Sequence, residues 1–386
     1  MLTGFLLCGH TNQIEEARVV DLTEAKSENI RTWELYCDTL KRAGLQLQRQ
    51  EAPQDDFNQA EGMRYLSRLA RIGLEMFVEG GDEQFPTFMV PSHETAKIGA
   101  DNPDMGYLAA RINGQYTYRV SGLRGSAASI NFSTKRGGYD KSGKLEPGGF
   151  IDSNSLTFAQ DGSFELVISQ YPQPGNWLKI DPDSIQLLIR QVFLDRANEK
   201  PAQLKIERID ADGKPFPINP RKLRNNLVQA ARFVENTATT FANWPQSYEG
   251  HINQLPPADQ ALCQSVGGDP NIFYYHSRWQ LAEDEALVIH LDRIPDCEYW
   301  NIQVNNYWME SLDYRYYRIS LNQHSAKPNP DGSVTLVIAH RDPGTSNWLE
   351  TAGHDDGTLC FRWIGSKEQV HPRTHVVKLN ELPLGL

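Results

Sequence analysis

The chain has 386 residues, enough for two or three compact units, and its 39% hydrophobic and 23% charged residues are the balance of a globular protein. With a formal net charge of −11, its surface repels phosphate backbones and anionic lipids, which excludes nucleic acid and membrane surfaces as expected partners. Five cysteines without a Cys-x-x-Cys pair, and no basic apolar leader at the start, predict reduced thiols, no signal peptide and a cytoplasmic location.

Helical patterns open the chain. Apolar residues at three- and four-residue spacing predict one helix over residues 30–50 and a second over residues 57–79, which a Gly-Gly pair then ends. A third helix is expected over residues 220–243, followed by a linker or surface loop over residues 244–257. The apolar stripes of the first two helices are interpreted as core packing.

Short segments in which apolar and polar residues alternate fill the two stretches that follow the helices, and Gly- and Asp-rich turns separate them. Many short strands separated by such turns are typical of a β-sandwich. The chain is therefore predicted to be mainly β, with two tandem jelly-roll-like sandwich modules, an N-terminal helical segment and a helical connection. The expected units are residues 1–85 (helical segment), 86–215 (first module), 216–260 (helical linker) and 261–386 (second module).

An internal repeat joins the two β stretches. Three pieces recur in the same order at offsets of 170 to 172 residues, and drifts of one residue are what loop insertions produce. Duplication of one β-module explains this pattern, and the two copies are expected to pack side by side because each can cover the other's sheet edges. The matched pieces are residues 161–168 with 331–338, Asn-Trp-Leu at 176–178 with 347–349, and Arg190 with Arg362.

The repeated pattern resembles the domain-of-unknown-function family 1214, whose larger relatives pair it with family 1254. The resemblance rests on a series of features in order: Asp-Gly-Ser, an apolar strand, a Pro-containing loop, Asn-Trp-Leu and an apolar strand that contains Arg. The series is clearest over residues 331–363 and weaker over residues 161–190. With the helical segment 61–66 and the loop 101–103, the resemblance covers most of the chain. It implies a fold similar to tandem jelly rolls of the viral-capsid type, often assembled as trimers, and it supplies no reaction and no catalytic residue.

The duplicated residues have an architectural and a functional interpretation. Asn347 and Trp348 either close a loop and plug the end of the sandwich, which is favoured because both copies need the same corner, or bind substrate. Arg362, like its counterpart in the first copy, lies within an apolar strand, where a guanidinium needs a partner. That partner is a carboxylate such as Asp195 or Asp356, or else an anionic substrate group that Arg362 holds bidentately.

Ionisable residues distinguish the second copy from the first. His340, Asp342, His354 and Asp356 flank its Asn-Trp loop. They predict an acid/base site, with His354 as the acid/base, a neighbouring Asp orienting it and Arg362 holding an oxyanion; the alternative is a polar hairpin tip in water. The His-x-His spacing of jelly-roll metal sites is absent, so no cofactor is predicted and a divalent metal has little support.

A polar strand face is a further candidate. Alternation places Tyr299 and Asn301 on one face of a strand, and together with Trp308 they are expected either to line a pocket for a hydroxylated ligand or to form an exposed sheet face. Glu310 and Asp313 have the residue types of a glycosidase carboxylate pair, although the sequence does not fix their separation.

The leading hypothesis is a hydrolase or lyase that acts by acid/base chemistry on a small, largely apolar, hydroxylated molecule of terpenoid, steroid or aromatic type. A homodimer or homotrimer is expected. The rival hypotheses are a carbohydrate-active enzyme and a non-catalytic ligand-binding or shell-type protein. Nucleotide cofactors are not expected, because the glycine-rich dinucleotide and phosphate-binding motifs are missing.

Overall fold

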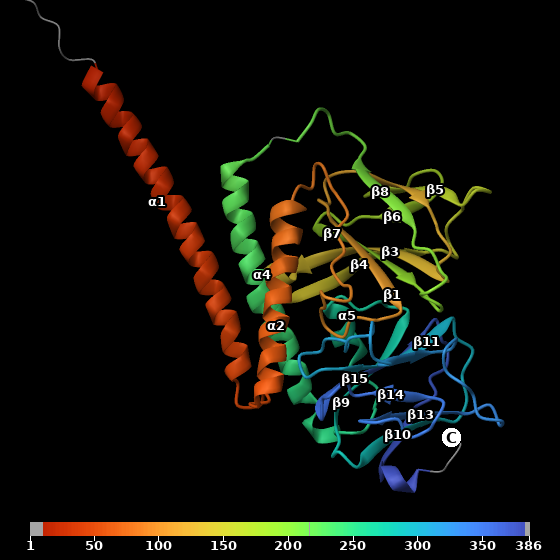
Figure 1. The fold of residues 1–386 in the computed structure, drawn as a ribbon. Coiled ribbons are helices and arrows are strands. Elements are labelled where there is room, and N and C mark those ends of the chain that lie inside the picture. Colours follow the sequence, from red (N-terminus) through yellow and green to blue (C-terminus); the bar gives the residue numbers. More distant parts are fainter. Residues whose placement is uncertain (1–10, 216, 383–386) are drawn as a thin grey trace, which may run out of the picture.

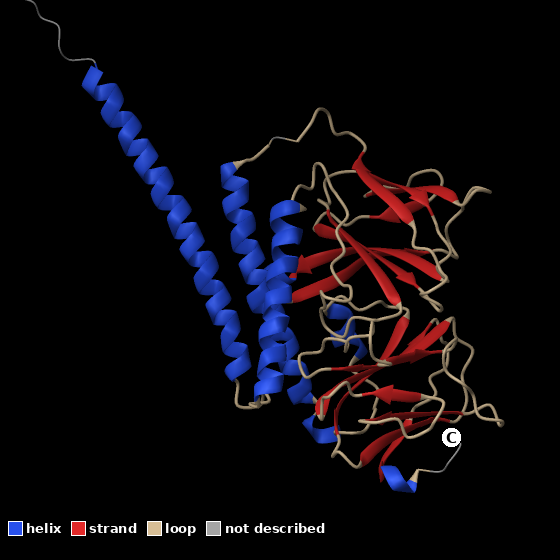
Figure 2. Ribbon diagram, in the orientation of Figure 1, coloured by secondary structure: helices blue, strands red, loops and turns tan. Residues whose placement is uncertain are grey.

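Three long helices lie along one side of two stacked β-modules in the computed structural model, which describes residues 11–215 and 217–382 (Figures 1 and 2). They are α1 (Thr11–Gly44), α2 (Asp56–Gly73) and α4 (Pro220–Ser247). Within these described ranges no helix combines the length and the apolar character that crossing a membrane requires. The structure does not describe residues 1–10, which include Cys8 and to which the signal-peptide prediction refers. The other four cysteines are free.

The first module is a sandwich of two four-stranded sheets, drawn from orange through yellow to light green in Figure 1. The strand orders are β1-β7-β3-β4 and β6-β5-β2-β8. The bounds are β1 (Met105–Arg111), β2 (Tyr118–Leu123), β3 (Ser129–Gly138), β4 (Lys144–Asp152), β5 (Ser163–Ser169), β6 (Trp177–Lys179), β7 (Ser184–Val192) and β8 (Gln203–Arg208), with the short helix α3 (Tyr139–Ser142) between β3 and β4.

The second module repeats this architecture after the short helix α5 (Gln260–Ser265). Its sheets have the orders β12-β11-β15-β9 and β14-β13-β10-β16. The bounds are β9 (Ile272–Gln280), β10 (Glu285–Leu291), β11 (Tyr299–Asn305), β12 (Ser320–Asn322), β13 (Val334–Ala339), β14 (Trp348–Glu350), β15 (Asp356–Ile364) and β16 (Arg373–Lys378). Single helical turns occupy Leu45–Gln48, Leu74–Glu79, Glu249–His251 and Leu379–Glu381.

The two modules correspond strand by strand, so the predicted duplication of a mainly β fold is confirmed. Adding eight to each strand number of the first module gives the neighbours of the second, in both sheets. The parallel pair β5–β6 recurs as β13–β14, while all other pairs of named strands are antiparallel. Each sandwich encloses its own apolar core, and a third core lies between the helices and the modules.

The helices begin where the sequence caps them. Asp55 accepts a hydrogen bond from Asn58 N at the start of α2, and Asn219 accepts one from Lys222 N at the start of α4, which has Pro220 in its first turn. The apolar stripe of α2 then packs into the third core, as predicted, and the apolar face of α4 packs into the same core. The first helix is longer than expected: it begins at Thr11 rather than near residue 30.

Candidate functional site

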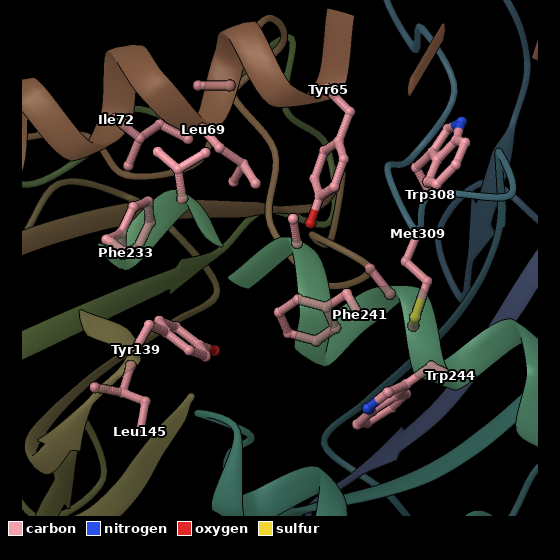
Figure 3. Packing of buried hydrophobic residues seen from close by; sticks show 14 of the residues in the cluster. Tyr65, Leu69, Ile72, Tyr139, Leu145, Phe233, Phe241, Trp244, Trp308 and Met309 are labelled. Atoms are coloured by element: carbon pink, nitrogen blue, oxygen red, sulfur yellow. The ribbon is translucent and has the colours of Figure 1, made fainter. Parts of the chain in front are cut away.

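A cavity of about 140 Å³ lies where α4 and the two modules meet. Phe233, Phe241 and Trp244 project from α4 and form an apolar wall (Figure 3). Tyr139 and Leu145 of the first module lie across from them in the same view. A cavity of this volume is large enough for a molecule of about the size of benzene.

The two matched arginines reach this cavity from opposite modules. Arg190 on β7 and Arg362 on β15 are 7% and 4% exposed, and both line it. Tyr107 is the cross-strand neighbour of Arg190, and Tyr274 is that of Arg362. The duplication therefore places the same tyrosine–arginine pair on each side of one cavity.

Each arginine also binds a loop of the other module. Arg190 Nη2 donates to the carbonyl oxygen of Gly267 at 2.5 Å, and Arg362 Nη2 donates to that of Ala100 at 2.5 Å. Ala100 has a φ of 56°, a conformation that costs a non-glycine residue about 1–2 kcal/mol. A non-glycine residue in a left-handed conformation beside a cavity, like Ala100 here, is typical of binding and active sites.

The two loops correspond, but one residue breaks their symmetry. In the loop before β1, Asn102 N donates to the hydroxyl of Tyr107 at 3.0 Å. In the loop before β9, Asp269 N donates to the hydroxyl of Tyr274 at 3.0 Å. An asparagine of the first module thus stands where the second module has an aspartate.

The charges around the two arginines differ as a result. Arg190 Nη1 lies 3.7 Å from Asp269 Oδ2. Arg362 Nη1 instead donates to Gln303 Oε1 at 2.6 Å and to Asn301 Oδ1 at 3.4 Å. Across residues 11–215 and 217–382, no carboxylate oxygen lies within 4 Å of the Arg362 guanidinium. Arg362 is therefore a buried cation held by neutral groups.

Three buried polar atoms of the cavity lining have no hydrogen-bond partner in the described part of the chain. They are the donor Asn102 Nδ2, the ring nitrogen His276 Nδ1, and Arg190 Nη1, which has an ion-pair contact with Asp269 Oδ2 at 3.7 Å but no hydrogen bond. An unpaired buried donor costs about 1–3 kcal/mol, so a cluster of such atoms at one cavity calls for an explanation. Their convergence makes the cavity suited to a ligand that carries hydrogen-bond acceptors.

The histidine, Cys263 and two of the tyrosines of the lining have pKa values that lie or are shifted away from neutral pH. Burial, aided by the Arg362 guanidinium, lowers the pKa of His276 to about 3. Burial raises the pKa of Cys263 to about 12, and it raises the pKa of Tyr139 and of Tyr274 above the usual range of tyrosine. Efficient general acids and bases have pKa values near the working pH, so these groups favour binding over proton transfer.

Lys135 adds a buried amine to the first module's side of this junction. It is 0% exposed, and its Nζ donates to the carbonyl oxygen of Gly267 at 3.4 Å. Burial, and next the nearby Arg190 guanidinium, lower the pKa of Lys135 to about 7. The unfolded chain therefore holds more protons than the folded chain between pH 7 and about 10, and stability rises with pH across that window.

We expect Lys135→Met to raise the free energy of unfolding at pH 7 by about 1–2 kcal/mol, because it removes a cation from an apolar interior. The gain should shrink as the pH rises to 10. Urea unfolding at pH 7, 8.5 and 10 measures both effects. The exposed Lys144, substituted in the same way, should change stability by no more than about 0.5 kcal/mol at any of these pH values. Equal pH slopes for wild type and Lys135→Met would contradict the assignment.

Comparison with known structures decides the family. The crystal structure of an uncharacterized protein from Burkholderia cenocepacia is 58% identical in sequence, with a TM-score of 0.91 over 93% of this chain and 100% of that chain. The model of the family described as "Protein of unknown function (DUF1214)" matches residues 144–192 and 277–368. The chain belongs to the DUF1214 family.

Other comparisons are more distant. The crystal structure of the VPA0106 protein from Vibrio parahaemolyticus is 11% identical, with a TM-score of 0.46 over 82% of this chain and 98% of that chain. None of the curated proteins compared with this DUF1214 chain matches it. The two family segments fall on corresponding parts of the duplication, since the first covers β4 to β7 and the second runs from β9 past β15.

In this DUF1214 chain, the two histidines of the predicted acid/base site do share a surface depression. The ring nitrogens of His340 lie 2.9 Å from Thr351 Oγ1 and 3.1 Å from the carbonyl oxygen of Leu281. His354 Nδ1 lies 3.0 Å from the carbonyl oxygen of Thr351, and its Nε2 lies 3.9 Å from Glu61 Oε2. Only the His354–Thr351 contact lies within one loop, while His340 joins the end of β13 to the loops before β10 and β15.

The rest of the predicted acid/base group does not assemble there. Asp342 is exposed and accepts a hydrogen bond from the backbone of its own turn. Asp356 forms an ion pair with Arg278, at 2.5 Å, because the two are close across β15 and β9. Arg362 faces the cavity between the modules. The structure therefore does not bring the four predicted acid/base residues together, and of these only the two histidines line the same depression.

Neither Asp195 nor Asp356, the carboxylates predicted as partners of the matched arginines, pairs with Arg190 or Arg362. Asp356 is taken by Arg278, and Asp195 accepts from Asn198 Nδ2 at 2.7 Å. The carboxylate beside Arg190 is Asp269, which lies in the other module and so was not a neighbour that the sequence could indicate.

Asn347 and Trp348 use their polar atoms to hold backbone. Asn347 Oδ1 accepts from Lys327 N at 2.8 Å, and its Nδ2 donates to the carbonyl oxygens of Lys327 and Thr335. Trp348 Nε1 donates to the carbonyl oxygen of Ala339 at 3.0 Å. The matching Asn-Trp of the first copy makes the equivalent bonds, which favours the architectural interpretation.

The polar strand face is neither a pocket wall nor an exposed surface. Tyr299 donates its hydroxyl to Asp104, and Asn301 Nδ2 donates to Asn102 Oδ1 at 2.8 Å, so this face packs against the loop before β1. Both side chains are buried. Trp308 is buried too, and its Nε1 donates to the carbonyl oxygen of Asn58 at 3.0 Å. The face positions Arg362 instead of contacting the cavity itself.

The predicted carboxylate pair is divided between two ion pairs. Glu310 is buried and lies 2.6 Å from Arg68 of α2, while Asp313 lies 2.6 Å from Arg315 at the surface. Neither carboxylate lines the cavity between the modules. Among the residues that the structure describes, no three His, Cys, Asp or Glu side chains are grouped closely enough to hold a metal ion.

The sequence interpretation missed the aromatic wall of the cavity. Phe233, Phe241 and Trp244 fall within or just after the predicted third helix, which was taken as a connection between modules. His276 was missed because it lies on a buried strand with no motif around it. The density of aromatic residues in α4 was the available signal, since a helix that only connects two modules has no need of so large an apolar face.

Proposed function

We propose that the protein binds a small, largely aromatic molecule in the cavity between its two modules. The observation that carries this proposal is the composition of the lining: aromatic side chains of α4 on one side, and a few convergent polar groups supplied by both modules on the other. Predominantly apolar walls with few well-placed polar groups are typical of small-molecule sites.

Binding is better supported than turnover. The hydrolase or lyase of the sequence interpretation needs a group that exchanges a proton near neutral pH, and the lining has the pKa values of its histidine, cysteine and tyrosines shifted away from that range. A sugar is also a poorer occupant than an arene, because hydroxyls that face the apolar α4 wall would lack hydrogen-bond partners. Acid/base chemistry, a cytoplasmic location and a homo-oligomer stay predictions.

The test is binding of phenol, a neutral arene that a cavity of this volume can hold. Phenol at millimolar concentration is expected to raise the melting temperature, since a ligand that binds only the folded state stabilises it. Cys263→Leu should reduce this shift at least severalfold, because Cys263 lines the cavity and the larger side chain occupies part of its volume. Calorimetric titration measures the affinity directly.

The matched control is Cys297→Leu. Cys297 lies in the core region of the second module and does not line the cavity, so this variant should keep the phenol affinity of the wild type. The proposal fails if neither phenol, benzamide nor benzoate binds the wild type, or if the two leucine variants bind phenol equally.

A further inference from the structure

We infer that the molecule in this cavity carries one carboxylate, which gives Arg362 the counter-charge that Asp269 gives Arg190. This inference rests on the proposed function and names the chemical class of its ligand. Its starting point is the broken symmetry of the two loops, in which Asn102 stands where the other module has Asp269.

The first module shows what a complete arrangement contains. Asp269 Oδ2 accepts from Asn131 Nδ2 at 3.1 Å and lies 3.7 Å from Arg190 Nη1. Asn131 is in turn the cross-strand neighbour of Arg190. The Asp269 carboxylate of the second module thus contacts both Asn131 and Arg190 of the first module.

The second module repeats the arginine and its cross-strand asparagine, but Asn102 replaces the aspartate, and Gln303 Oε1 accepts from Arg362 Nη1 at 2.6 Å. Asn301 is the cross-strand neighbour of Arg362, and its Nδ2 donates to Asn102 Oδ1 at 2.8 Å. Asn102 Oδ1 also accepts from Asp104 N at 3.0 Å, so the amide is fixed with its Nδ2 unpaired. Arg362 and the free Asn102 Nδ2 both belong to the cavity lining, where they offer a cation and a neutral donor to an incoming carboxylate.

The other charges near the cavity do not supply the missing one. Asp101 belongs to the lining, but its two oxygens accept from Ser311 N at 3.0 Å and Ser311 Oγ at 2.8 Å, and Lys97 donates to the same serine. Asp104 accepts from the hydroxyl of Tyr299; burial raises its pKa and the Arg196 and Arg362 guanidiniums oppose that effect, but no Asp104 oxygen lies within 4 Å of Arg362. Buried guanidinium groups need a counter-charge, and a ligand carboxylate provides it here.

Volume and lining then narrow the ligand to an aromatic monocarboxylate of about the size of benzoate. The ring would pack against the α4 wall of Phe233, Phe241 and Trp244, and the carboxylate would face Arg362. A second carboxylate would find only Arg190, which Asp269 already partners. The protein is therefore expected to bind an aromatic monocarboxylate more tightly than an aromatic dicarboxylate.

The experiment compares benzoate with benzamide, its neutral analogue of nearly equal shape, by calorimetric titration of the full chain. Benzoate should bind the wild type at least about tenfold more tightly, as a charge-assisted pair in a buried site allows. Asn102→Asp supplies the missing carboxylate within the protein and should weaken benzoate at least about tenfold, while benzamide changes less than about threefold. Asp269→Asn, which frees Arg190, should keep or strengthen benzoate binding.

The outcomes separate this inference from the proposed function. If benzamide binds the wild type as tightly as benzoate, or if Asn102→Asp keeps the affinity for benzoate, the carboxylate assignment is overturned while the arene site stands. If neither compound nor phenol binds, both fall. The wild-type comparison needs no variant, so the inference remains testable even if a substitution prevents folding.

Discussion

Glu310→Ala is expected to lower the free energy of unfolding by about 3–5 kcal/mol. Glu310 Oε1 lies 2.6 Å from Arg68 Nη1, and both side chains are less than a tenth exposed. Burial raises the pKa of Glu310, and the Arg68 guanidinium opposes that effect. Without the carboxylate, the guanidinium stays buried with no counter-charge, which costs far more than the intact pair contributes. Urea unfolding followed by circular dichroism measures the loss.

Two further variants control for this prediction. Asp313→Ala removes the other carboxylate of the proposed glycosidase pair, but its partner Arg315 is 40% exposed, so the loss should stay below about 1 kcal/mol. Replacing Arg68 and Glu310 together by leucine should restore most of the stability lost by Glu310→Ala, because no charge is left behind. If Asp313→Ala costs as much as Glu310→Ala, burial is not the cause.

The fold was largely predictable because duplication leaves a signal that periodicity alone does not. Short strands of alternating residues indicated sandwiches, and the repeat indicated two of them; the matching strand orders confirm both. The start of α1 was not predictable, because residues 11–29 are rich in polar residues and show no apolar stripe, whereas the structure continues the helix to Thr11. Periodicity detects a helix only where one face is buried.

The site was predictable only in part. The repeat drew attention to Arg362, which lines the cavity, but the Ala100 carbonyl oxygen that it binds lies 262 residues earlier in the chain, in the other module. Spacing along the chain carries no information about contacts between modules. The same limit explains Asp356, whose partner Arg278 lies across a strand pair rather than within the histidine loop.

Gly62→Ala is expected to destabilise the protein by about 2–3 kcal/mol, although alanine is the better helix former. A Cβ at Gly62 would lie 2.5 Å from Leu47 Cδ2 and 2.8 Å from the Trp308 ring, which is buried and hydrogen-bonded and cannot retreat. Gly44→Ala is the matched control: its backbone is helical, no atom lies within 4 Å of the new Cβ, and stability should rise by up to about 1 kcal/mol. Thermal and urea unfolding of both variants measure the contrast. Changes of the same sign would mean that α2 does not pack against Trp308 as closely as the structure places it.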